Sequence, residues 1–217
     1  MSNYPIIVIG RQFGSGGHEI GVKLAQKLGI PLYDKEILAR IAEEQGIDVD
    51  RLNKMDENLK GNHMLNVGIQ AHRFNIYDPG LMFETDTSAI ISRNQAFAWQ
   101  SAKIRELAAA GPCIIIGRCA DYILRDHPGL ISIFITAPLA AREARIARLY
   151  PNHPREFYET HLMFIEKTDK ARANYYNFHT DRNWSDIHNY HLCVDSTKLG
   201  IDGTAEMLAD YVKRVAG

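Results

Sequence analysis

A glycine-rich turn near the N-terminus, residues 11–18, constrains the fold of this chain more than any other segment. It follows an apolar run at residues 6–9, which is typical of a buried strand, and precedes an amphipathic stretch at residues 19–28. A strand, a glycine loop and a helix in this order form an anion cradle, because backbone N–H groups and the positive end of the helix dipole face one point. The sequence therefore predicts a nucleotide-phosphate site whose loop residues are Gly14, Ser15, Gly16, Gly17 and His18.

The loop departs from the usual G-x-x-x-x-G-K-[ST] pattern at three positions. Gly16 aligns with the glycine before the lysine, which puts Arg11 at the first glycine. Gly17 then stands at the lysine, and His18 stands at the hydroxyl residue that binds magnesium. We expect Arg11, which emerges directly from the first strand, to supply the missing cation, and Ser15 to supply a hydroxyl. The alternative is a glycine turn with a structural role only.

Apolar runs that predict strands alternate with helical patterns along the chain. The strand runs are nearly continuous in apolar residues, as in parallel strands that are buried on both faces. They cover residues 6–9, 31–33, 113–116, 131–136 and 191–195, and the helical patterns cover 19–28, 34–44, 92–110, 138–150 and 204–215. This order predicts an α/β fold, a three-layer α/β/α sandwich with a parallel sheet of about five strands.

Two long segments, residues 48–87 and 151–188, interrupt this alternation. The first is polar and irregular. The second is rich in charged, aromatic and histidine residues, with a helix expected over residues 158–175. Long excursions from a compact sheet are usually lids or binding segments, and ligands in such sheets bind at the carboxyl ends of the strands. We therefore expect both segments to border the glycine loop.

Charged residues follow two of the predicted strands. Arg118 comes soon after the run at 113–116, where an arginine is costly unless it meets an anion or an acidic partner. We expect Arg118 to contact a ligand, and Asp121 to be a second contact or the ion-pair partner of Arg118. Asp34 follows the short strand and is either a helix cap or a ligand contact. Arg40, on the next helix, has the fork-shaped donor geometry that suits a phosphate.

A basic cluster lies in the second segment, within two turns of the expected helix. A mobile lid would bring such charge onto a transferring phosphoryl group, where catalysis is mainly positioning and charge neutralisation. The alternative is an exposed helix with salt bridges. The arginine run at residues 142–148 is expected to be a solvated helix face. The residues of the basic cluster are Lys167, Lys170 and Arg172.

The charge and composition of the 217-residue chain exclude several classes of protein. With 25 basic and 26 acidic residues, the net charge of −1 argues against a dedicated nucleic-acid-binding protein. No stretch approaches the ~18 apolar residues of a membrane span, and three cysteines without metal-ligand spacing suit a reducing compartment. We therefore expect a soluble, cytoplasmic protein with no membrane partner. The nine histidines form no metal-binding motif, so we assign no metal ligand.

Several of these segments together resemble the cytidylate kinase-like family, relatives of the bacterial cytidylate kinases among P-loop nucleoside monophosphate kinases. The resemblance rests on the stretches 11–17, 33–38, 117–124, 169–176 and 195–201, which lie in the family's order along nearly the whole chain. It implies one P-loop kinase-like domain. Its core would be residues 1–47, 92–150 and 189–217, with an insert that binds a nucleoside monophosphate (NMP) at about 48–91 and a lid at about 151–188.

The resemblance also implies a reaction in which the γ-phosphoryl group of ATP, with Mg²⁺, passes to CMP or dCMP. Matched to cytidylate kinases, Asp34, Arg40 and Arg118 fall on contacts to the monophosphate nucleotide. The basic cluster and Asp169 lie where the family's lid carries arginines and an aspartate. Three functions stay open. One is a phosphotransferase, which Arg40, Arg118 and the basic lid favour. Another is a nucleotide-binding regulator that lost turnover, which Gly17 and His18 favour. The third is a phosphate-binding interaction module without nucleotide, which a rigid, packed lid would support. Nucleotides are the expected partners, and a homo-oligomer is an open alternative to a monomer.

Overall fold

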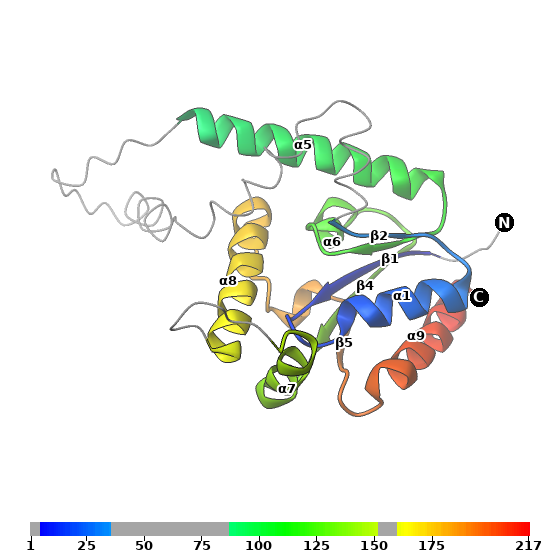
Figure 1. Cartoon of the computed structure of the whole chain (residues 1–217). Coiled ribbons are helices and arrows are strands. Elements are labelled where there is room, and N and C mark those ends of the chain that lie inside the picture. The colour runs from blue at the N-terminus through cyan, green and yellow to red at the C-terminus, as the bar shows by residue number, and fades with distance from the viewer. Residues whose placement is uncertain (1–4, 36–86, 152–159) are drawn as a thin grey trace, which may run out of the picture.

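The computed structural model describes residues 5–35, 87–151 and 160–217, with the backbone alone at 87–94. Its centre is a five-stranded, all-parallel sheet in the order β2-β3-β1-β4-β5 (Figure 1). The α/β fold expected from the alternation of apolar runs and helical patterns is therefore confirmed. The strands are β1 (Ile6–Arg11), β2 (Leu32–Tyr33), β3 (Ile114–Ile116), β4 (Leu130–Thr136) and β5 (Leu192–Asp195).

Helices cover both faces of the sheet and make the three expected layers (Figure 1). Side chains of β1 alternate between the faces, as successive residues of a strand must. Ile7 and Ile9 pack in one core with α1 and α9, whereas Ile6 and Val8 pack in the other with α5, α6 and α8. The helices are α1 (Gly17–Leu28), α5 (Thr87–Ala110), α6 (Ala120–Ile123), α7 (Leu139–Leu149), α8 (His161–Thr180) and α9 (Gly200–Ala216), with a 3₁₀ turn at Ile187–Asn189.

The central strand β1 ends later than its apolar run suggested. The expected strand stopped at residue 9, whereas β1 continues through Gly10 to Arg11, which still pairs with Ile135 of β4. A Cβ at Gly10 would lie only 2.8 Å from the Phe134 ring, so the close packing of the two strands requires a glycine there. The extension carries Arg11 to the carboxyl edge of the sheet, where the glycine loop begins.

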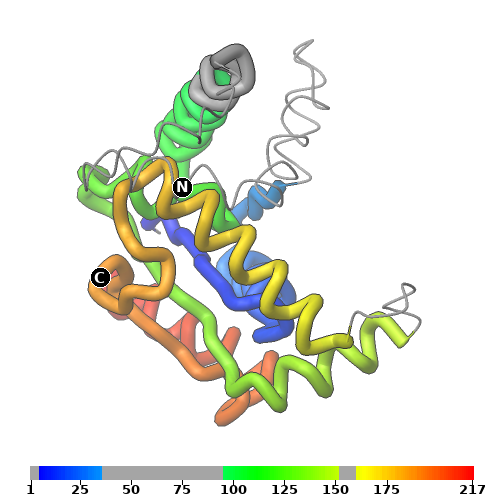
Figure 2. Tube along the Cα trace, turned by 90° about the vertical axis from the view of Figure 1, so that its left-hand side faces the viewer, coloured from blue at the N-terminus to red at the C-terminus, as the bar shows by residue number. Residues whose placement is uncertain are grey.

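Helix α8 differs most from its expected bounds. It was expected over residues 158–175, but it begins after Thr160, whose hydroxyl accepts a hydrogen bond from the Met163 amide at 3.2 Å. It ends at Asp181, which adopts a left-handed φ of 54°. Figure 2 shows α8 lying beside β1. The helix of the expected lid thus runs alongside the strand that leads into the glycine loop.

Three expectations fall outside the described residues. These are the helix at 34–44 beyond its first two residues, Arg40, and the NMP-binding insert at about 48–91, apart from its last few residues, which begin α5. The division into core, insert and lid therefore stays a prediction. Within the described ranges, no helix is long and apolar enough to cross a membrane.

Candidate active site

The glycine loop between β1 and α1 depends on two glycines in the left-handed region. Gly14 has φ 81° and Gly16 has φ 80°. A Cβ at Gly14 would also lie 3.0 Å from the Cβ of Arg142, so a larger residue would be both strained and crowded. Gly16 caps α1 without a side-chain hydrogen bond to its amides. The first amides of α1 are thus arranged as the anion cradle requires.

Ser15 faces into the protein. The residue is 2% exposed, and its hydroxyl donates to the Gln12 carbonyl oxygen at 2.8 Å. Its carbonyl oxygen accepts a hydrogen bond from the Ser196 hydroxyl at 2.6 Å. The side chain of Ser15 therefore stabilises the loop, and the structure gives no support to Ser15 as a replacement for the magnesium-binding hydroxyl.

The side chain of Arg11 runs between two glycines. A Cβ at Gly17 would lie 2.5 Å from the Arg11 Cβ and 3.1 Å from its Cγ, and a Cβ at Gly117 would overlap the Arg11 Nη1. Because protein interiors are close-packed, a side chain at either glycine would displace that of Arg11. The arginine at position 11 and a side chain at position 17 would therefore compete for the same space.

Arg11, Arg118 and Arg172 form a cluster of cations at this edge of the sheet. Burial lowers the pKa of Arg11 to about 9, and the charges of Arg172 and Arg118 also lower it. Asp34 and Asp169 oppose this shift. Burial lowers the pKa of Arg172 as well. An arginine remains charged at neutral pH, so Arg118 and Arg172 repel Arg11, and the carboxylates of Asp34 and Asp169 offset part of this repulsion.

His18 contacts Asp34 across the mouth of the loop. The His18 Nε2 lies 3.0 Å from the Asp34 Oδ2, which joins the first turn of α1 to the residue after β2. The Asp34 side chain is only 15% exposed. His18 thus directs its ring to a carboxylate, while Asp34 stands at the carboxyl edge of the sheet where a ligand contact was expected.

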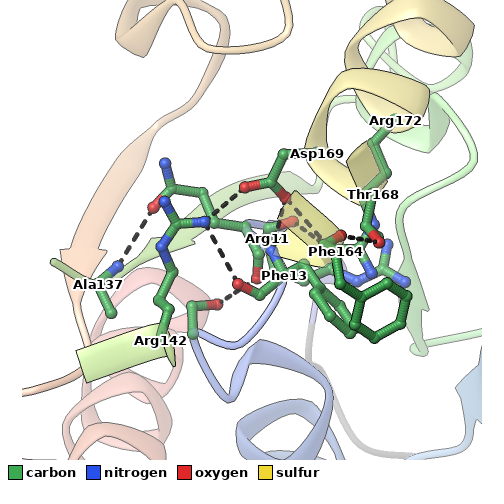
Figure 3. Close-up of polar contacts among 10 residues, drawn as sticks. Arg11, Phe13, Ala137, Arg142, Phe164, Thr168, Asp169 and Arg172 are labelled. Carbon is green, nitrogen blue, oxygen red and sulfur yellow. Dashed lines mark hydrogen bonds and ion pairs between the residues drawn. The ribbon is translucent and has the colours of Figure 1, made fainter. Parts of the chain in front are cut away.

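Asp169 of α8 binds the glycine loop directly (Figure 3). Its Oδ1 accepts a hydrogen bond from the Phe13 amide at 2.7 Å, and its Oδ2 forms an ion pair with the Arg142 Nη1 at 2.5 Å. Arg142 comes from α7, is buried, and also donates to the Phe13 carbonyl oxygen at 3.3 Å. Three elements that are distant in sequence therefore meet at one residue of the loop.

The basic cluster predicted on α8 divides into two groups. The Arg172 Nη1 donates to the Arg11 carbonyl oxygen at 3.0 Å, and its guanidinium lies 5.5 Å from the centre of the Phe13 ring (Figure 3). Lys167 and Lys170 are exposed. The structure therefore brings Arg172 to the loop and leaves the two lysines on the outer side of the helix.

Arg118 and Asp121 lie in different surroundings. Arg118 follows β3 with a φ of 60°, and its guanidinium carbon lies 5.7 Å from the centre of the Tyr175 ring. Asp121 is buried and accepts a 2.6 Å hydrogen bond from the Tyr176 hydroxyl, and burial raises its pKa. Asp121 is thus part of the core, and a contact between Asp121 and a ligand has no support in the structure.

The arginine run on α7 is not a uniform solvated face. Arg142 is buried under the loop, as described above, and Arg145 forms an ion pair with Glu19 in the first turn of α1. Arg148 is exposed. The expected solvated face is therefore wrong for Arg142 and Arg145, because α7 packs against the loop instead of standing apart from it.

Comparisons with known proteins identify the family of this chain. The sequence model of the cytidylate kinase-like family matches residues 6–198. The chain belongs to that family. Among solved structures, an uncharacterized protein from Eubacterium ventriosum is 28% identical, with 96% of this chain and 98% of that chain covered and a TM-score of 0.65. A shikimate kinase from Acinetobacter baumannii, in complex with shikimate, is 14% identical over 99% and 93% of the two chains, with a TM-score of 0.49. The search of curated proteins gives no match.

Two parts of this cytidylate kinase-like site were missed by sequence reasoning. One is the bond from Asp169 to the loop, although its spacing of three from Arg172 puts both residues on one helix face. The other is Gln100 of α5, which donates a hydrogen bond to the Arg118 carbonyl oxygen at 3.1 Å. A glutamine in a long helix carries no local pattern that distinguishes it, so only the tertiary contact identifies it.

Proposed function

We propose that this cytidylate kinase-like protein transfers the γ-phosphoryl group of ATP to a nucleoside monophosphate, with CMP and dCMP as the first acceptors to test. The observation that carries the proposal is the position of Arg11 between Gly17 and Gly117. Arg11 supplies a cation in the space where the side chain of a P-loop lysine would begin. The altered loop therefore keeps the positive charge on which phosphoryl transfer depends.

The proposed reaction uses the loop for the donor and the arginine cluster for the transferred group. The amides of residues 14–18 bind the phosphates of ATP, and Arg118 binds the phosphate of the acceptor. An acceptor phosphate oxygen attacks the γ-phosphorus, the bond from that phosphorus to the β–γ bridging oxygen breaks, and ADP leaves. No proton has to be removed, because the acceptor phosphate is ionised at neutral pH. Arg11 and Arg172 balance the charge that develops on the transferred group. Asp34 and Arg40 are proposed to contact the acceptor nucleotide, whereas Lys167 and Lys170, which are exposed on α8, are assigned no ligand contact.

Mg²⁺ enters this reaction with ATP, as the ion that bridges its phosphates. Among the described residues, no three His, Cys, Asp or Glu side chains come together to hold a metal ion. The Ser15 hydroxyl, the expected ligand from the loop, donates its hydrogen bond to the Gln12 carbonyl oxygen instead. We therefore treat the ion as part of the MgATP substrate and assign no residue to it.

A coupled assay of ADP release, with CMP, dCMP, UMP and AMP as acceptors, tests the proposal. We expect turnover with at least one acceptor and a loss of about 10²-fold or more in kcat for Arg11→Met, since this is the cost of removing one transition-state donor. Arg148→Met, an exposed arginine on α7, is the matched control and should turn over normally. Wild-type turnover by Arg11→Met would refute the role of Arg11.

A nucleotide-binding regulator without turnover is the second candidate. The contact of His18 with Asp34 favours it, because a histidine so engaged does not replace the hydroxyl that binds magnesium in a P-loop. Calorimetry separates the two candidates. Binding of ATP with no ADP release for any of the four acceptors would decide for the regulator.

A further inference from the structure

The turn after β3 holds three successive residues in the left-handed region. Gly117 has φ 68°, Arg118 has φ 60° and Cys119 has φ 56°. This region is costly for residues other than glycine, so two such residues in a row persist only where their surroundings hold them. Gly117 faces the Arg11 guanidinium on one side, and Cys119 begins α6 on the other. The backbone conformation of Arg118 is therefore fixed by its surroundings, and it sets the direction in which the side chain leaves the turn.

Gln100 of α5 supports this turn. Its Nε2 donates hydrogen bonds to the Arg118 carbonyl oxygen at 3.1 Å and to the Tyr175 hydroxyl at 3.0 Å. The Tyr175 hydroxyl also lies 3.3 Å from the Gln100 Oε1, to which it donates. Gln100 is only 7% exposed, so water competes weakly for these bonds. The amide of Gln100 thus has one defined orientation, set by Arg118 and Tyr175.

Tyr175 contacts Arg118 a second time through its ring. The guanidinium carbon of Arg118 lies 5.7 Å from the ring centre, within the range of a cation–π interaction. The two ends of Arg118 are therefore held by a single pair of side chains: Gln100 binds the carbonyl group, and Tyr175 lies against the guanidinium. The pair also joins α5 to α8, the helix whose Asp169 binds the glycine loop.

We propose that Gln100 is a positioning residue that, with Tyr175, directs the Arg118 guanidinium toward the phosphate of the acceptor. The identity of that ligand rests on the proposed function, whereas the support of Arg118 by Gln100 does not. If Gln100 served packing alone, its substitution would raise KM for both substrates. A positioning role affects the acceptor and leaves ATP, which binds at the glycine loop, largely unaffected.

Gln100→Met tests this role, because methionine has a similar length and volume but donates no hydrogen bond. With ATP and CMP varied separately, we expect KM for CMP to rise about five- to tenfold, as for the loss of one to two neutral hydrogen bonds, and KM for ATP to stay within about twofold. Gln95→Met is the matched control, since Gln95 is exposed on the same helix. Tyr175→Phe keeps the ring, removes the hydroxyl and should raise KM for CMP less. It carries the test if Gln100→Met does not fold.

A second readout does not depend on turnover. The NMR signal of the Arg118 Nε–H group, assigned by its loss in Arg118→Lys, reports the surroundings of this side chain. The change of the signal as inorganic phosphate is added reports phosphate binding at Arg118. We expect Gln100→Met to shift or broaden the signal and to weaken phosphate binding, and Gln95→Met to do neither. Equal rises of both KM values, or an unchanged signal in folded Gln100→Met, would overturn the positioning role. An inactive wild-type protein would contradict the proposed function, while the NMR experiment would still decide the role of Gln100.

Discussion

Asp169 of α8 accepts a hydrogen bond from the backbone amide of Phe13, so the expected lid and the glycine loop are bonded to each other at 2.7 Å. Backbone amides of such loops normally bind anions, and here a carboxylate of the same chain takes one of them. The second oxygen of that carboxylate pairs with Arg142 of α7. The Phe13 ring adds a second contact between the loop and α8, since it packs edge-on against the Phe164 ring with the two ring centres 4.9 Å apart. The loop, α7 and α8 should therefore gain or lose their order together.

Asp169→Asn keeps the shape of this side chain and removes its charge. We expect the free energy of unfolding to fall by about 1.5–3 kcal/mol, because buried Arg142 loses its charged partner. Urea denaturation measures the change. Asp202→Asn is the control, since its 2.7 Å pair with Lys23 lies on the surface and should contribute little. Equal losses in the two variants would contradict a structural role for the Asp169 contact.

Gly17 and Arg11 compete for one space, which predicts that substitutions at the two sites are strongly coupled. Gly17→Ala should destabilise the protein by about 1–3 kcal/mol, because the new methyl group would lie 2.5 Å from the Arg11 Cβ. With Arg11→Gly present, the same change should cost much less, because only the 3.2 Å approach to the Ile135 Cβ remains and alanine favours a helix by about 1 kcal/mol over glycine.

Urea denaturation of the four proteins in this double-mutant cycle gives the interaction free energy, which we expect to be at least about 1 kcal/mol. Gly203→Ala in α9 is the control. Its Cβ would lie 3.1 Å from the Leu199 Cβ and would not contact Arg11, so its effect should add to that of Arg11→Gly. Additivity at Gly17 would show that the two side chains do not share a space.

The order of strands and helices could be predicted because buried apolar runs and amphipathic periods are local properties of the sequence. The ends of these elements depend on distant partners. β1 reaches Arg11 only because Ile135 of β4 pairs with it, and α8 continues past residue 175 where the Tyr176 hydroxyl binds Asp121 of α6. Neither partner is contained in the local pattern that predicts the element.

The candidate site shows the same division between local and distant information. The glycine pattern predicted a loop between a strand and a helix, and the structure has this loop between β1 and α1. The role of Arg11 as a substitute for the lysine stays a prediction. The reason that Arg11 fits involves Gly117, which lies in the turn after β3 and has no recognisable relation to the loop in sequence. The spacing of Asp121 from Arg118 suggested an ion pair, but the short helix α6 directs Asp121 into the core, where the Tyr176 hydroxyl binds it.

The cluster of Arg11, Arg118 and Arg172 predicts that polyanions stabilise the protein. Inorganic pyrophosphate should raise the free energy of unfolding, by about 2.7 kcal/mol at a concentration about 100 times its Kd. Thermal denaturation with pyrophosphate, against sodium chloride of equal ionic strength, measures this effect. Arg118→Met should remove most of it, and Arg148→Met, which changes an exposed arginine, should keep it. An equal shift with chloride would show a salt effect and contradict the anion site.

The buried pair of Asp121 and Tyr176 predicts a stability that depends on pH. Burial raises the pKa of Asp121, and the Tyr176 hydroxyl opposes this by donating to the carboxylate. A carboxyl group whose pKa is higher in the folded protein than in the unfolded chain stabilises the fold at a pH below its pKa in the unfolded chain. This stability is lost as the pH rises through its pKa in the folded protein. Tyr176→Phe raises that pKa further, so its cost should be larger at about pH 7.5 than at about pH 4, roughly 2–3 against roughly 1 kcal/mol. Urea denaturation at both pH values measures the difference.

Tyr190→Phe is the control. The Tyr190 hydroxyl donates to the uncharged Trp184 carbonyl oxygen at 2.9 Å, so its removal should cost the same free energy of unfolding at both pH values. A cost of Tyr176→Phe that does not change with pH would mean that the hydroxyl does not stabilise an ionised Asp121.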